Sequence, residues 1–444
     1  MKATIITTDA AKGRFWEEAT AEVSETGECM QVINLFPEIK EQQIEGFGGA
    51  FTEAAAHNYA RLNAREQAAV IAGYYTPEGL NYNLGRIPIH SSDFGLGNYT
   101  YIDEGDKELA TFSVERDEKE ILPMIGAAIQ AADDTVEFIC APWSPPAFMK
   151  DNHQMNNGGH LLPEYMESWA QYYVRFIKAY RQRGVAIRYL TVQNEPQATQ
   201  TWDSCIYSAV EEGEFVVRFL APALKRAGLD DIEIFLWDHN KEAAYQRVRD
   251  TFAVDGCREE VSGVAVHWYT GDHFGAISAV RAVYPEMKVF FTEGCVEYSR
   301  FADSGEVQKA EMYAHDILGN LAAGCSAIVD WNLLLDEKGG PNHVGNFCAA
   351  PMMCDGQGGV EKRLSYYYIG HFSRYIKRGA RRIMTSSYTD KVENIAFINP
   401  DGSRVAIICN RSDHEVTATL REETKGLPLQ IKPHTIMTIA LPNS

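Results

Sequence analysis

The sequence predicts an α/β protein, a (β/α)8 TIM barrel that carries a side β-sandwich built from both chain ends. Three observations lead to this expectation. From residue 44 onward, eight short apolar runs alternate with longer stretches of helical period. Before and after this region, short strand-like runs are separated mostly by Gly, Pro, Asn and Asp. Eight strand–helix units fit a closed barrel better than an open doubly wound sheet.

The barrel strands are expected where the short apolar runs interrupt the helical stretches. Two of the intervening helices have recognisable ends. Asn63 and Glu66 form a capping pair. Pro163 opens a helix that runs to about Arg183 and stops at Gly184. The predicted strands are Ile44–Thr52, Leu80–Ser91, Thr135–Pro142, Ile187–Glu195, Ile232–Asp238, Val261–Tyr269, Lys288–Glu293 and Ser326–Asn332.

The flanking segments are expected to form antiparallel strands. Neither end alone is long enough for a stable two-layer core, so both ends should build one β-sandwich beside the barrel. The predicted domains are therefore a β-sandwich of residues 1–43 with 376–444 and a catalytic barrel of residues 44–375. The strand-like runs are Ala3–Thr8, Ala19–Val23, Met30–Leu35, Asn394–Ile398, Arg404–Cys409, Val416–Leu420, Leu429–Ile431 and Thr435–Leu441.

Composition and charge restrict the class of partner. Of the 444 residues, 45% are apolar and 23% charged, which excludes a disordered, collagenous or disulfide-scaffold protein. The 41 Lys and Arg against 61 Asp and Glu give a net charge of −20, and no basic block is present. Such a charge repels polyanions. Nucleic acid and anionic membranes are therefore not expected as partners, whereas neutral or cationic substrates remain open.

The sequence also gives expectations about location. No run of about 18 apolar residues occurs, so no stable membrane insertion is expected. Residues 1–20 mix charges of both signs and show no export signal. The nine cysteines are scattered, and several lie in apolar runs, which favours reduced thiols. A cytoplasmic location follows from these observations, whereas the oligomeric state stays open.

Two glutamates close predicted strands on opposite sides of the barrel. Glu195 ends the fourth strand and Glu293 the seventh, at the edge where barrels of this type gather their functional groups. Paired carboxylates in one pocket are what retaining glycoside hydrolysis requires, with Glu195 as acid/base and Glu293 as nucleophile. A strand-end glutamate is more often only a solvated acid. The Asn-Glu-Pro sequence directly after an apolar strand favours the catalytic interpretation.

Other strand ends supply polar and aromatic side chains. A sugar needs both, because its ring has apolar faces and its hydroxyls need hydrogen-bond partners. Taken singly, Arg86 and Asp93 could form a structural ion pair. Trp143 and Trp331 could fill the core, and His267 could be a satisfied buried histidine. Their shared position at strand ends favours a binding site instead.

These residues stand within longer motifs, which extend from about residue 44 to residue 373. The motifs are Gly46–Thr52, Arg86–Ile89 with Ser92–Phe94, Pro142–Pro146 with Met149–Lys150, Asn194–Pro196, His267–Tyr269, Thr292–Glu293, Asp330–Leu333 with Gly339–Asn342, and His371–Ser373. In these segments the sequence resembles glycoside hydrolase family 30, and particularly its glucosylceramidase branch.

The resemblance implies a clan A barrel with a side sandwich, a retaining mechanism and no cofactor. It implies Glu195 as acid/base and Glu293 as nucleophile. It also implies hydrolysis of terminal β-glucosyl residues, with β-xylosyl or β-fucosyl residues as further options, and a link to sphingolipid metabolism. The chain departs from the branch at His343, where an aromatic is usual, and this leaves the lipid substrate open. The implied glycone residues are Arg86, Asp93, Trp143, Asn194, His267, Tyr269, Trp331 and Asn346.

Other functions are less well supported by the sequence. Within the family, endo-β-1,6-glucanase is the alternative activity, so the substrate is expected to be a small-molecule or an oligosaccharide β-glycoside. A non-catalytic carbohydrate-binding barrel is a remote alternative, since both carboxylates are present. The glycine-rich Gly46–Gly49 lacks the pattern of a dinucleotide loop. No metal-ligand motif and no serine-nucleophile motif occurs, so no metal is expected.

Overall fold

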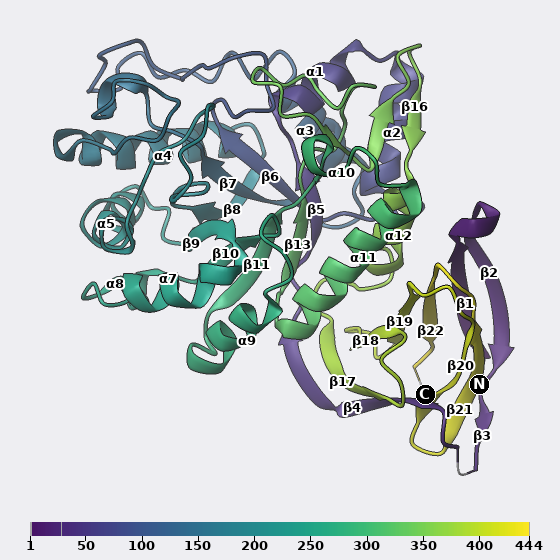
Figure 1. The fold of residues 1–444 in the computed structure, drawn as a ribbon. Helices are drawn as coiled ribbons and strands as arrows, with labels where there is room; N and C mark the ends of the chain where they lie inside the picture. Colours follow the sequence, from purple (N-terminus) through teal and green to yellow (C-terminus); the bar gives the residue numbers. More distant parts are fainter. Residues whose placement is uncertain (1, 28, 444) are drawn as a thin grey trace.

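The structure, a computed structural model that describes residues 2–27 and 29–443, confirms the predicted fold class (Figure 1). Eight parallel strands close into a barrel in the order β5-β6-β7-β8-β9-β10-β11-β13. Each predicted barrel strand overlaps one of them. Their bounds are β5 Gly46–Ala50, β6 Leu84–Ile89, β7 Glu137–Pro142, β8 Ala186–Thr191, β9 Glu233–Asn240, β10 Gly263–His267, β11 Lys288–Glu293 and β13 Ala327–Asp330.

Several barrel strands end earlier than the sequence predicted. β8 ends at Thr191, before Glu195, and β13 ends at Asp330, before Asn332. Glu195 has a φ of +46° and Asn332 a φ of +67°. Non-glycine residues rarely adopt this left-handed conformation, and it breaks the strand ladder. The residues that follow the strand ends are also buried, because they form the site. The apolar pattern therefore continues past the ends of the strands.

The helices cover the outside of the barrel. The Asn63 side chain accepts hydrogen bonds from the backbone N–H groups of Arg65 and Glu66 and so caps α2, as predicted. Residues 163–165 form a short 3-10 turn before α4. The helices are α1 Glu53–Arg61, α2 Ala64–Tyr75, α3 Ile121–Ala131, α4 Met166–Arg181, α5 Ala209–Phe215, α6 Ala221–Arg226, α7 Ala244–Thr251, α8 Cys257–Glu260, α9 Phe274–Val283, α10 Tyr298–Phe301, α11 Glu306–Ala323 and α12 Leu364–Ser373.

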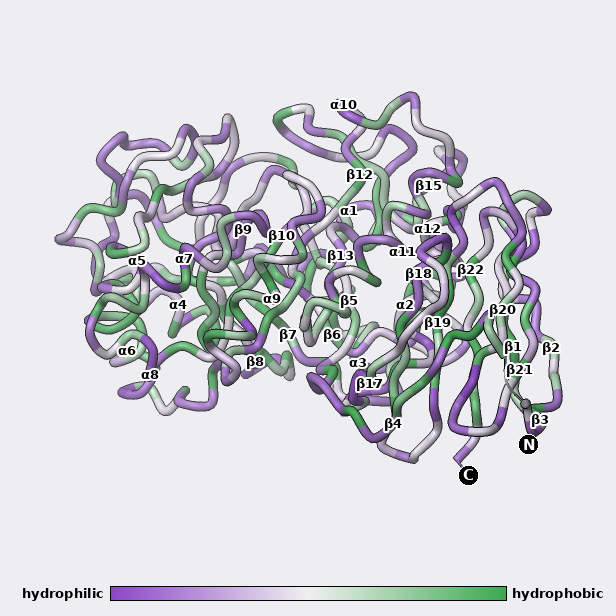
Figure 2. Tube along the Cα trace, turned by 60° about the horizontal axis from the view of Figure 1, so that its bottom comes forward, coloured by the Kyte–Doolittle hydropathy of each residue, from purple (hydrophilic) through white to green (hydrophobic). Residues whose placement is uncertain are grey.

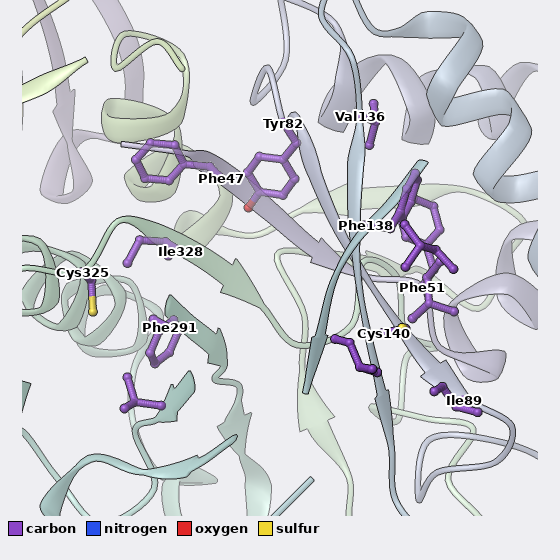
Figure 3. Packing of buried hydrophobic residues seen from close by; sticks show 14 of the residues in the cluster. Phe47, Phe51, Tyr82, Ile89, Val136, Phe138, Cys140, Phe291, Cys325 and Ile328 are labelled. Atoms are coloured by element: carbon purple, nitrogen blue, oxygen red, sulfur yellow. The ribbon is translucent and has the colours of Figure 1, made fainter. Parts of the chain in front are cut away.

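Aromatic and branched side chains fill the barrel on both faces of its strands. Phe51, directly after β5, and Phe138 of β7 pack together on the outside of β6, the strand between them (Figure 3), and their ring centroids are 5.8 Å apart. Tyr189, Phe235 and Phe290 pack inside the barrel, where they form part of a separate buried cluster. The interior is therefore a packed core, and only its carboxyl end is free to form a site.

The second sheet has ten strands in the order β2-β1-β22-β19-β18-β17-β4-β20-β21-β3. One apolar core touches strands from the whole sheet, so the sheet folds over itself as a sandwich. In Figure 2 the apolar segments follow the strands of both regions, and the outer loops are mostly hydrophilic. The strands are β1 Lys2–Asp9, β2 Arg14–Glu22, β3 Ser24–Glu25, β4 Val32–Gln43, β17 Arg381–Ser387, β18 Glu393–Ile398, β19 Arg404–Asn410, β20 Val416–Glu422, β21 Lys425–Ile431 and β22 Thr435–Leu441.

Strand β17 is the one long sandwich strand that the sequence did not predict. It pairs with β4 and β18, and its side chains are mostly polar, apart from the buried Ile383 and the exposed Met384. The predicted domain boundaries stay predictions, and their outer ends at residues 1 and 444 lie outside the described residues. Within the described residues, no helix is long and apolar enough to cross a membrane.

The sandwich packs against α11 and α12 of the barrel (Figure 1). At the centre of this seam, the buried His371 of α12 contacts the hydroxyls of Thr8 on β1 and Thr438 on β22, both at 2.8 Å. The indole of Trp16 on β2 donates to the carbonyl of Tyr367 at 2.8 Å. Burial lowers the pKa of His371 to about 3, so this ring is neutral.

Candidate active site

A pocket of about 140 Å³ opens at the carboxyl ends of the barrel strands. Loops that follow the strands build the functional site in barrels of this type. The pocket combines aromatic rings with carboxylates and amides, the mixture that a sugar ring requires. Its lining residues are Asp93, Phe94, Trp143, Asn194, Glu195, Gln200, Trp202, His239, Asn240, Tyr269, Glu293, Cys295, Glu297, Trp331 and Asn346.

The two predicted carboxylates both line this pocket. Glu293 is the last residue of β11. Glu195 lies beyond the end of β8, and its backbone N–H donates to the carbonyl of Asp238 on β9 at 2.9 Å. An oxygen of Glu195, an oxygen of Glu293 and a nitrogen of His267 lie within 4.8 Å of one another. The positive φ of Glu195 is a strained conformation of the kind that recurs at functional sites.

Both oxygens of Glu293 accept hydrogen bonds. Arg86 Nη1 donates to Oε2 at 2.6 Å, and the Tyr269 hydroxyl donates to Oε1 at 2.9 Å. Burial raises the pKa of Glu293 above its ordinary value, and the positive charges of His267 and Arg86 oppose this shift without cancelling it. Because Arg86 can only donate, its contact fits the ionised carboxylate.

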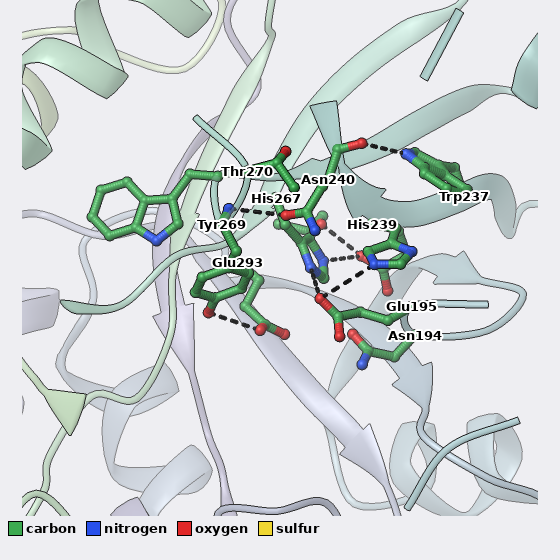
Figure 4. Close-up of polar contacts among 12 residues, drawn as sticks. Asn194, Glu195, Trp237, His239, Asn240, His267, Tyr269, Thr270 and Glu293 are labelled. Atoms are coloured by element: carbon green, nitrogen blue, oxygen red, sulfur yellow. Dashed lines mark hydrogen bonds and ion pairs between the residues drawn. The ribbon is translucent and has the colours of Figure 1, made fainter. Parts of the chain in front are cut away.

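Glu195 is surrounded by two imidazoles and an amide. His267 Nδ1 lies 3.2 Å from Oε1, and His239 Nε2 lies 3.8 Å from the same oxygen (Figure 4). Gln200 Nε2 donates to Oε2 at 3.4 Å. Burial raises the pKa of Glu195, but the hydrogen bond from His267 and the charges of His239 and His267 outweigh burial, so the pKa lies below its ordinary value. His267 therefore hydrogen-bonds to Glu195 and not to Glu293.

Asp238 is the functional residue that sequence reasoning missed. It has no exposed surface and accepts four hydrogen bonds. Arg86 Nη2 donates to Oδ2 at 2.7 Å, and the Thr191 hydroxyl donates to the same oxygen at 2.6 Å. His267 Nε2 lies 3.0 Å from Oδ1, to which the Thr292 hydroxyl donates at 2.6 Å. Against the effect of burial, Arg86 and His267 hold the pKa of Asp238 well below its usual range.

His267 lies at the centre of this carboxylate cluster. Burial alone would lower its pKa, but the negative charges of Glu293, Asp238 and Glu195 raise it to about 9. The imidazolium form is therefore favoured at neutral pH. In that form Nδ1–H points to Glu195 and Nε2–H to Asp238, so the ring holds a proton directly beside the predicted acid/base.

Stacked tryptophans form the opposite part of the pocket. The rings of Trp143 and Trp331 stack with centroids 5.1 Å apart and planes at 19°. The Arg86 guanidinium lies 4.8 Å from the Trp143 ring centroid. Asn346 Nδ2 donates to Asp93 Oδ2 at 3.2 Å. Burial raises the pKa of Asp93 well above its ordinary value, which favours a neutral carboxyl that can donate to a hydroxyl as well as accept from one.

The structure brings the ten predicted site residues together, although their roles stay predictions. Arg86 and His267 lie beneath the pocket wall with no exposed surface. An Arg86–Asp93 ion pair is not formed, because Arg86 pairs with Asp238 and Glu293. The predicted residues that line the pocket are Asp93, Trp143, Asn194, Glu195, Tyr269, Glu293, Trp331 and Asn346.

Some residues around the two glutamates were not predicted. Asp238 closes the predicted fifth strand, so the strand-end rule that selected Glu195 and Glu293 could have found it. His239 follows it directly. Gln200 and Trp202 lie in the loop after β8, which carries no periodic pattern, so the sequence held no signal for them.

A metal site can be considered at one place. Within residues 2–27 and 29–443, the only group of three metal-ligating side chains with ligand atoms close together is Glu195, His267 and Glu293. Both nitrogens of His267 already face carboxylates, and a metal would have to displace the proton between His267 and Glu195. The chemistry of this donor set is better suited to holding protons than to holding a metal ion.

Two family models match the chain. The model described as glycosyl hydrolase family 30 TIM-barrel domain matches residues 44–376, and the model described as glycosyl hydrolase family 30 beta sandwich domain matches residues 379–439. The lysosomal acid glucosylceramidase of Mus musculus is 30% identical over 420 residues, which cover 90% of this chain and 81% of that protein. The endo-1,6-beta-D-glucanase neg1 of Aspergillus fumigatus is 29% identical over 417 residues, with 86% and 82% covered.

Solved structures of similar proteins match the chain over a larger share of its length. The crystal structure of SrfJ from Salmonella typhimurium has a TM-score of 0.97 at 38% identity and covers 100% of both chains. The structure of the endo-beta1,6-glucanase BT3312 has a TM-score of 0.90 at 26% identity, again over 100% of both chains. The similar proteins therefore include both of the activities that the sequence left open.

Proposed function

This chain belongs to glycoside hydrolase family 30 and is an O-glycosyl hydrolase, and from this premise we propose that it removes terminal β-glucosyl residues with retention of configuration. The observation that carries the proposal is the pocket of about 140 Å³ into which Glu195 and Glu293 both project. Retaining enzymes hold their two carboxyls about 5–5.5 Å apart, and the short separation here agrees with that spacing.

The proposed reaction has two steps. In the first, an oxygen of Glu293 bonds to the anomeric carbon while the bond from that carbon to the leaving oxygen breaks, and Glu195 gives its proton to the leaving oxygen. In the second, Glu195 takes a proton from water, and the water oxygen displaces Glu293 from the anomeric carbon. Two inversions at that carbon give net retention.

The contacts of His267 explain how Glu195 obtains its proton. His267 Nδ1 lies 3.2 Å from Glu195 Oε1, and the pKa of His267 is about 9. When substrate excludes water, transfer of this proton leaves a neutral imidazole and a protonated Glu195. Asp238 holds the other nitrogen of the ring, so His267 keeps its orientation during the transfer.

The glycone contacts follow from the groups that remain available. Asn194 Oδ1 accepts from Arg86 Nη2 at 2.9 Å, which leaves its amide nitrogen to donate to the sugar 2-hydroxyl. A contact of this type strengthens in the oxocarbenium-like transition state. Asp93 and Asn346 offer further hydroxyl partners, and the Trp143–Trp331 stack closes the apolar side of the ring.

The second candidate function is endo-β-1,6-glucanase. It is supported by the similarity to endo-1,6-β-glucanases in both the curated proteins and the solved structures. That activity needs sugar subsites on both sides of the two glutamates, whereas an exo-acting enzyme needs only one closed glycone pocket. The sequence left a lipid-linked glucoside open, and the cytoplasmic location stays a prediction.

One experiment separates these functions. The enzyme is incubated with p-nitrophenyl β-glucoside, gentiobiose, glucosylceramide in detergent and pustulan, and values of kcat/KM are compared. We expect glucose as the product, with the β-anomer appearing first by NMR. Release of oligosaccharides from pustulan together with an inert aryl glucoside would establish the endo activity instead. Initial formation of the α-anomer would contradict the retaining mechanism.

A further inference from the structure

Strand β9 is distorted where it approaches the active site. Its register with β10 shifts there, because Ala265 lies opposite Trp237 whereas Val266 lies opposite His239. Asp238 is thus an extra residue in the strand, a β-bulge. Trp237 has a φ of +74° and Asp238 a φ of +49°. These conformations are unfavourable for residues other than glycine, so they persist only where the surrounding structure holds them.

The bulge directs three groups toward Glu195 and His267. The backbone carbonyl of Asp238 accepts from the backbone N–H of Glu195 at 2.9 Å. The carboxylate of Asp238 lies 3.0 Å from His267 Nε2. The next residue, His239, places its Nε2 3.8 Å from Glu195 Oε1 (Figure 4). A rotation of the backbone at the bulge would therefore displace all three groups together.

A buried ion pair in the helix layer contacts the bulge. Glu212 on α5 and Arg247 on α7 are 0% and 3% exposed. Glu212 Oε2 accepts from Arg247 Nε at 2.8 Å, and Glu212 Oε1 accepts from the backbone N–H of Trp237 at 3.0 Å. The Arg247 guanidinium lies 5.3 Å from the centroid of the Trp237 ring. The same ion pair therefore holds both the backbone and the ring of Trp237.

The Trp237 ring connects this ion pair to the pocket. Its indole N–H donates to the backbone carbonyl of Asn240 at 2.8 Å. It also packs against the ring of His239, with centroids 4.8 Å apart (Figure 4). His239 and Asn240 both line the pocket, and the ion pair lies behind them in the helix layer. The ion pair can therefore affect the reaction only through the bulge.

Stability alone does not account for this ion pair. Removal of two charges from water costs free energy that their attraction offsets only in part, and apolar residues of the same volume are often equally stable. In addition, Arg247 Nη1 is buried and has no hydrogen-bond partner among the described residues. What the ion pair supplies is a carboxylate oxygen fixed beside the Trp237 N–H, where the strained backbone needs an acceptor.

We propose that Glu212 and Arg247 are positioning residues for Glu195. They hold the bulge of β9 in the conformation that directs Asp238 and His239 into the site. The inference rests on the proposed role of Glu195 as the acid/base. Neither residue of the ion pair lies in the pocket, so its loss should impair proton transfer to the leaving group more than it impairs sugar binding.

The test compares two double variants, neither of which leaves a buried charge unpaired. Glu212→Gln/Arg247→Leu keeps a side-chain oxygen for the Trp237 N–H, whereas Glu212→Leu/Arg247→Leu removes it. Because small displacements of catalytic groups are costly, kcat should fall about 10-fold to 100-fold in the leucine variant and stay within about threefold of wild type in the glutamine variant. KM should change little in either. Equal kcat in the two folded variants would overturn the inference.

The leaving group distinguishes positioning of the acid/base from a general disturbance of the pocket. A dinitrophenyl β-glucoside needs little protonation, whereas a phenyl β-glucoside needs the proton of Glu195. In Glu212→Leu/Arg247→Leu, kcat/KM should fall about 10-fold further for the phenyl substrate than for the dinitrophenyl substrate. An equal fall for both substrates would contradict the inference. Wild-type enzyme that hydrolyses neither substrate would instead defeat the proposed function.

Glu212→Asp gives a second comparison that needs neither the leucine variant nor a substrate. It keeps the charge opposite Arg247 but draws the carboxylate away from the Trp237 N–H. Charge compensation alone predicts that Glu212→Asp is more active than Glu212→Gln/Arg247→Leu, whereas the inference predicts the reverse order. Since Asp238 then moves away from His267, an NMR titration should also give His267 a lower pKa than in wild type. An unchanged pKa of His267 in Glu212→Asp would overturn the inference.

Discussion

Two buried histidines of this enzyme differ in charge, because His267 is favoured as the imidazolium and His371 is neutral. His267, at the barrel mouth, lies between the carboxylates of Glu195 and Asp238, which raise its pKa to about 9. His371, at the seam between the barrel and the sandwich, lies between two threonine hydroxyls, and burial lowers its pKa to about 3. Neither ring has exposed surface. Burial is therefore the same in both places, and the partners decide the charge.

The two regions therefore have different roles. The cluster at the mouth consists of Arg86, Asp238, His267 and the two glutamates. Its buried charges are compensated mainly by one another, which lowers stability but shifts pKa values in a way that catalysis can use. At the seam, neutral groups satisfy each other without any charge, which favours stability. Changes at the mouth should therefore affect turnover, whereas changes at the seam should affect the free energy of unfolding. The following predictions test this division, from the largest effect to the smallest.

The largest effect is expected from Glu293→Gln. The amide cannot act as nucleophile, so kcat should fall by about 10⁴-fold or more while the pocket stays intact. Glu45→Gln is the matched control, because Glu45 pairs with Lys288 at the opposite end of the barrel (3.1 Å) and should leave kcat unchanged. Steady-state kinetics and a melting curve of each variant provide the measurement. A Glu293 variant that keeps a tenth of the activity would refute the assignment.

Asp238→Asn should give the next largest effect. It removes one of the negative charges that raise the pKa of His267, so the ring loses its proton at a lower pH. The proposed mechanism requires that proton, so the alkaline limb of the kcat/KM profile should move to lower pH, and kcat/KM should fall about 100-fold or more. Thr292→Val is the control, since it removes one hydrogen bond to Asp238 but keeps the charge. An unchanged alkaline limb in Asp238→Asn would argue against the shared proton.

At the seam, His371→Leu should lower stability and leave turnover unchanged, which is the opposite of the effects expected at the mouth. Two hydrogen bonds are lost, and the free energy of unfolding should fall by about 1–3 kcal/mol. Thr438 still donates to the carbonyl of residue 371 at 2.9 Å, and Thr8 still accepts from the Trp16 backbone at 3.2 Å, so neither hydroxyl is left alone. Denaturant unfolding measures the loss, and kcat should not change. A large fall in kcat with normal stability would show that the seam communicates with the mouth.

The smallest effect is the pH dependence of stability. The folded pKa of His371 lies below the unfolded value of about 6.5, so its contribution is present above about pH 6.5 and is lost as the pH falls toward 3. The folded pKa of His267 lies above the unfolded value, so its contribution is present below about pH 6.5 and is lost as the pH rises toward 9. The melting temperature should therefore fall both toward pH 4 and toward pH 9. In His371→Leu, the decline on the acid side should become shallower.

At acid pH, activity should begin to decline at a higher pH than it would if Glu293 had the pKa of an ordinary carboxyl. The pKa of Glu293 is raised, and only its ionised form can attack, so kcat/KM should fall as the pH drops through that raised value. The pH–rate profile measures the limb. A limb at or below the pKa of a free glutamate would contradict the effect of burial described for Glu293.

Much of the fold could be predicted because it depends on local pattern. Strands such as Glu137–Pro142 and Lys288–Glu293 match their predicted positions closely, since an apolar run between two amphipathic helices fixes both the strand and its place in a parallel barrel. Glu293 could be identified for the same reason, because it ends a regular strand. Strand β17 was missed because it is mostly polar and is held by pairing with β4 and β18.

The contacts within the site depend on irregular backbone within and beyond the strands. His90 and Glu195 have positive φ after the ends of β6 and β8, and Trp237 and Asp238 have positive φ inside β9, where its register with β10 shifts. No sequence pattern specifies these conformations. They direct Asp238 toward Arg86 and His267 and bring His239 to Glu195. The chain segments involved lie far apart in the sequence, so their meeting depends on closure of the barrel.

The sequence by itself determined the barrel and the family and placed the two glutamates at strand ends as the predicted catalytic pair, because strand periodicity and strand-end motifs are local properties of the chain. Only the tertiary structure decided that His267 contacts Glu195 and that Asp238 binds both Arg86 and His267. Charge state and ligand preference arise from groups on different strands that meet in a medium of low dielectric constant, where a pKa depends on the neighbours and not on the residue type.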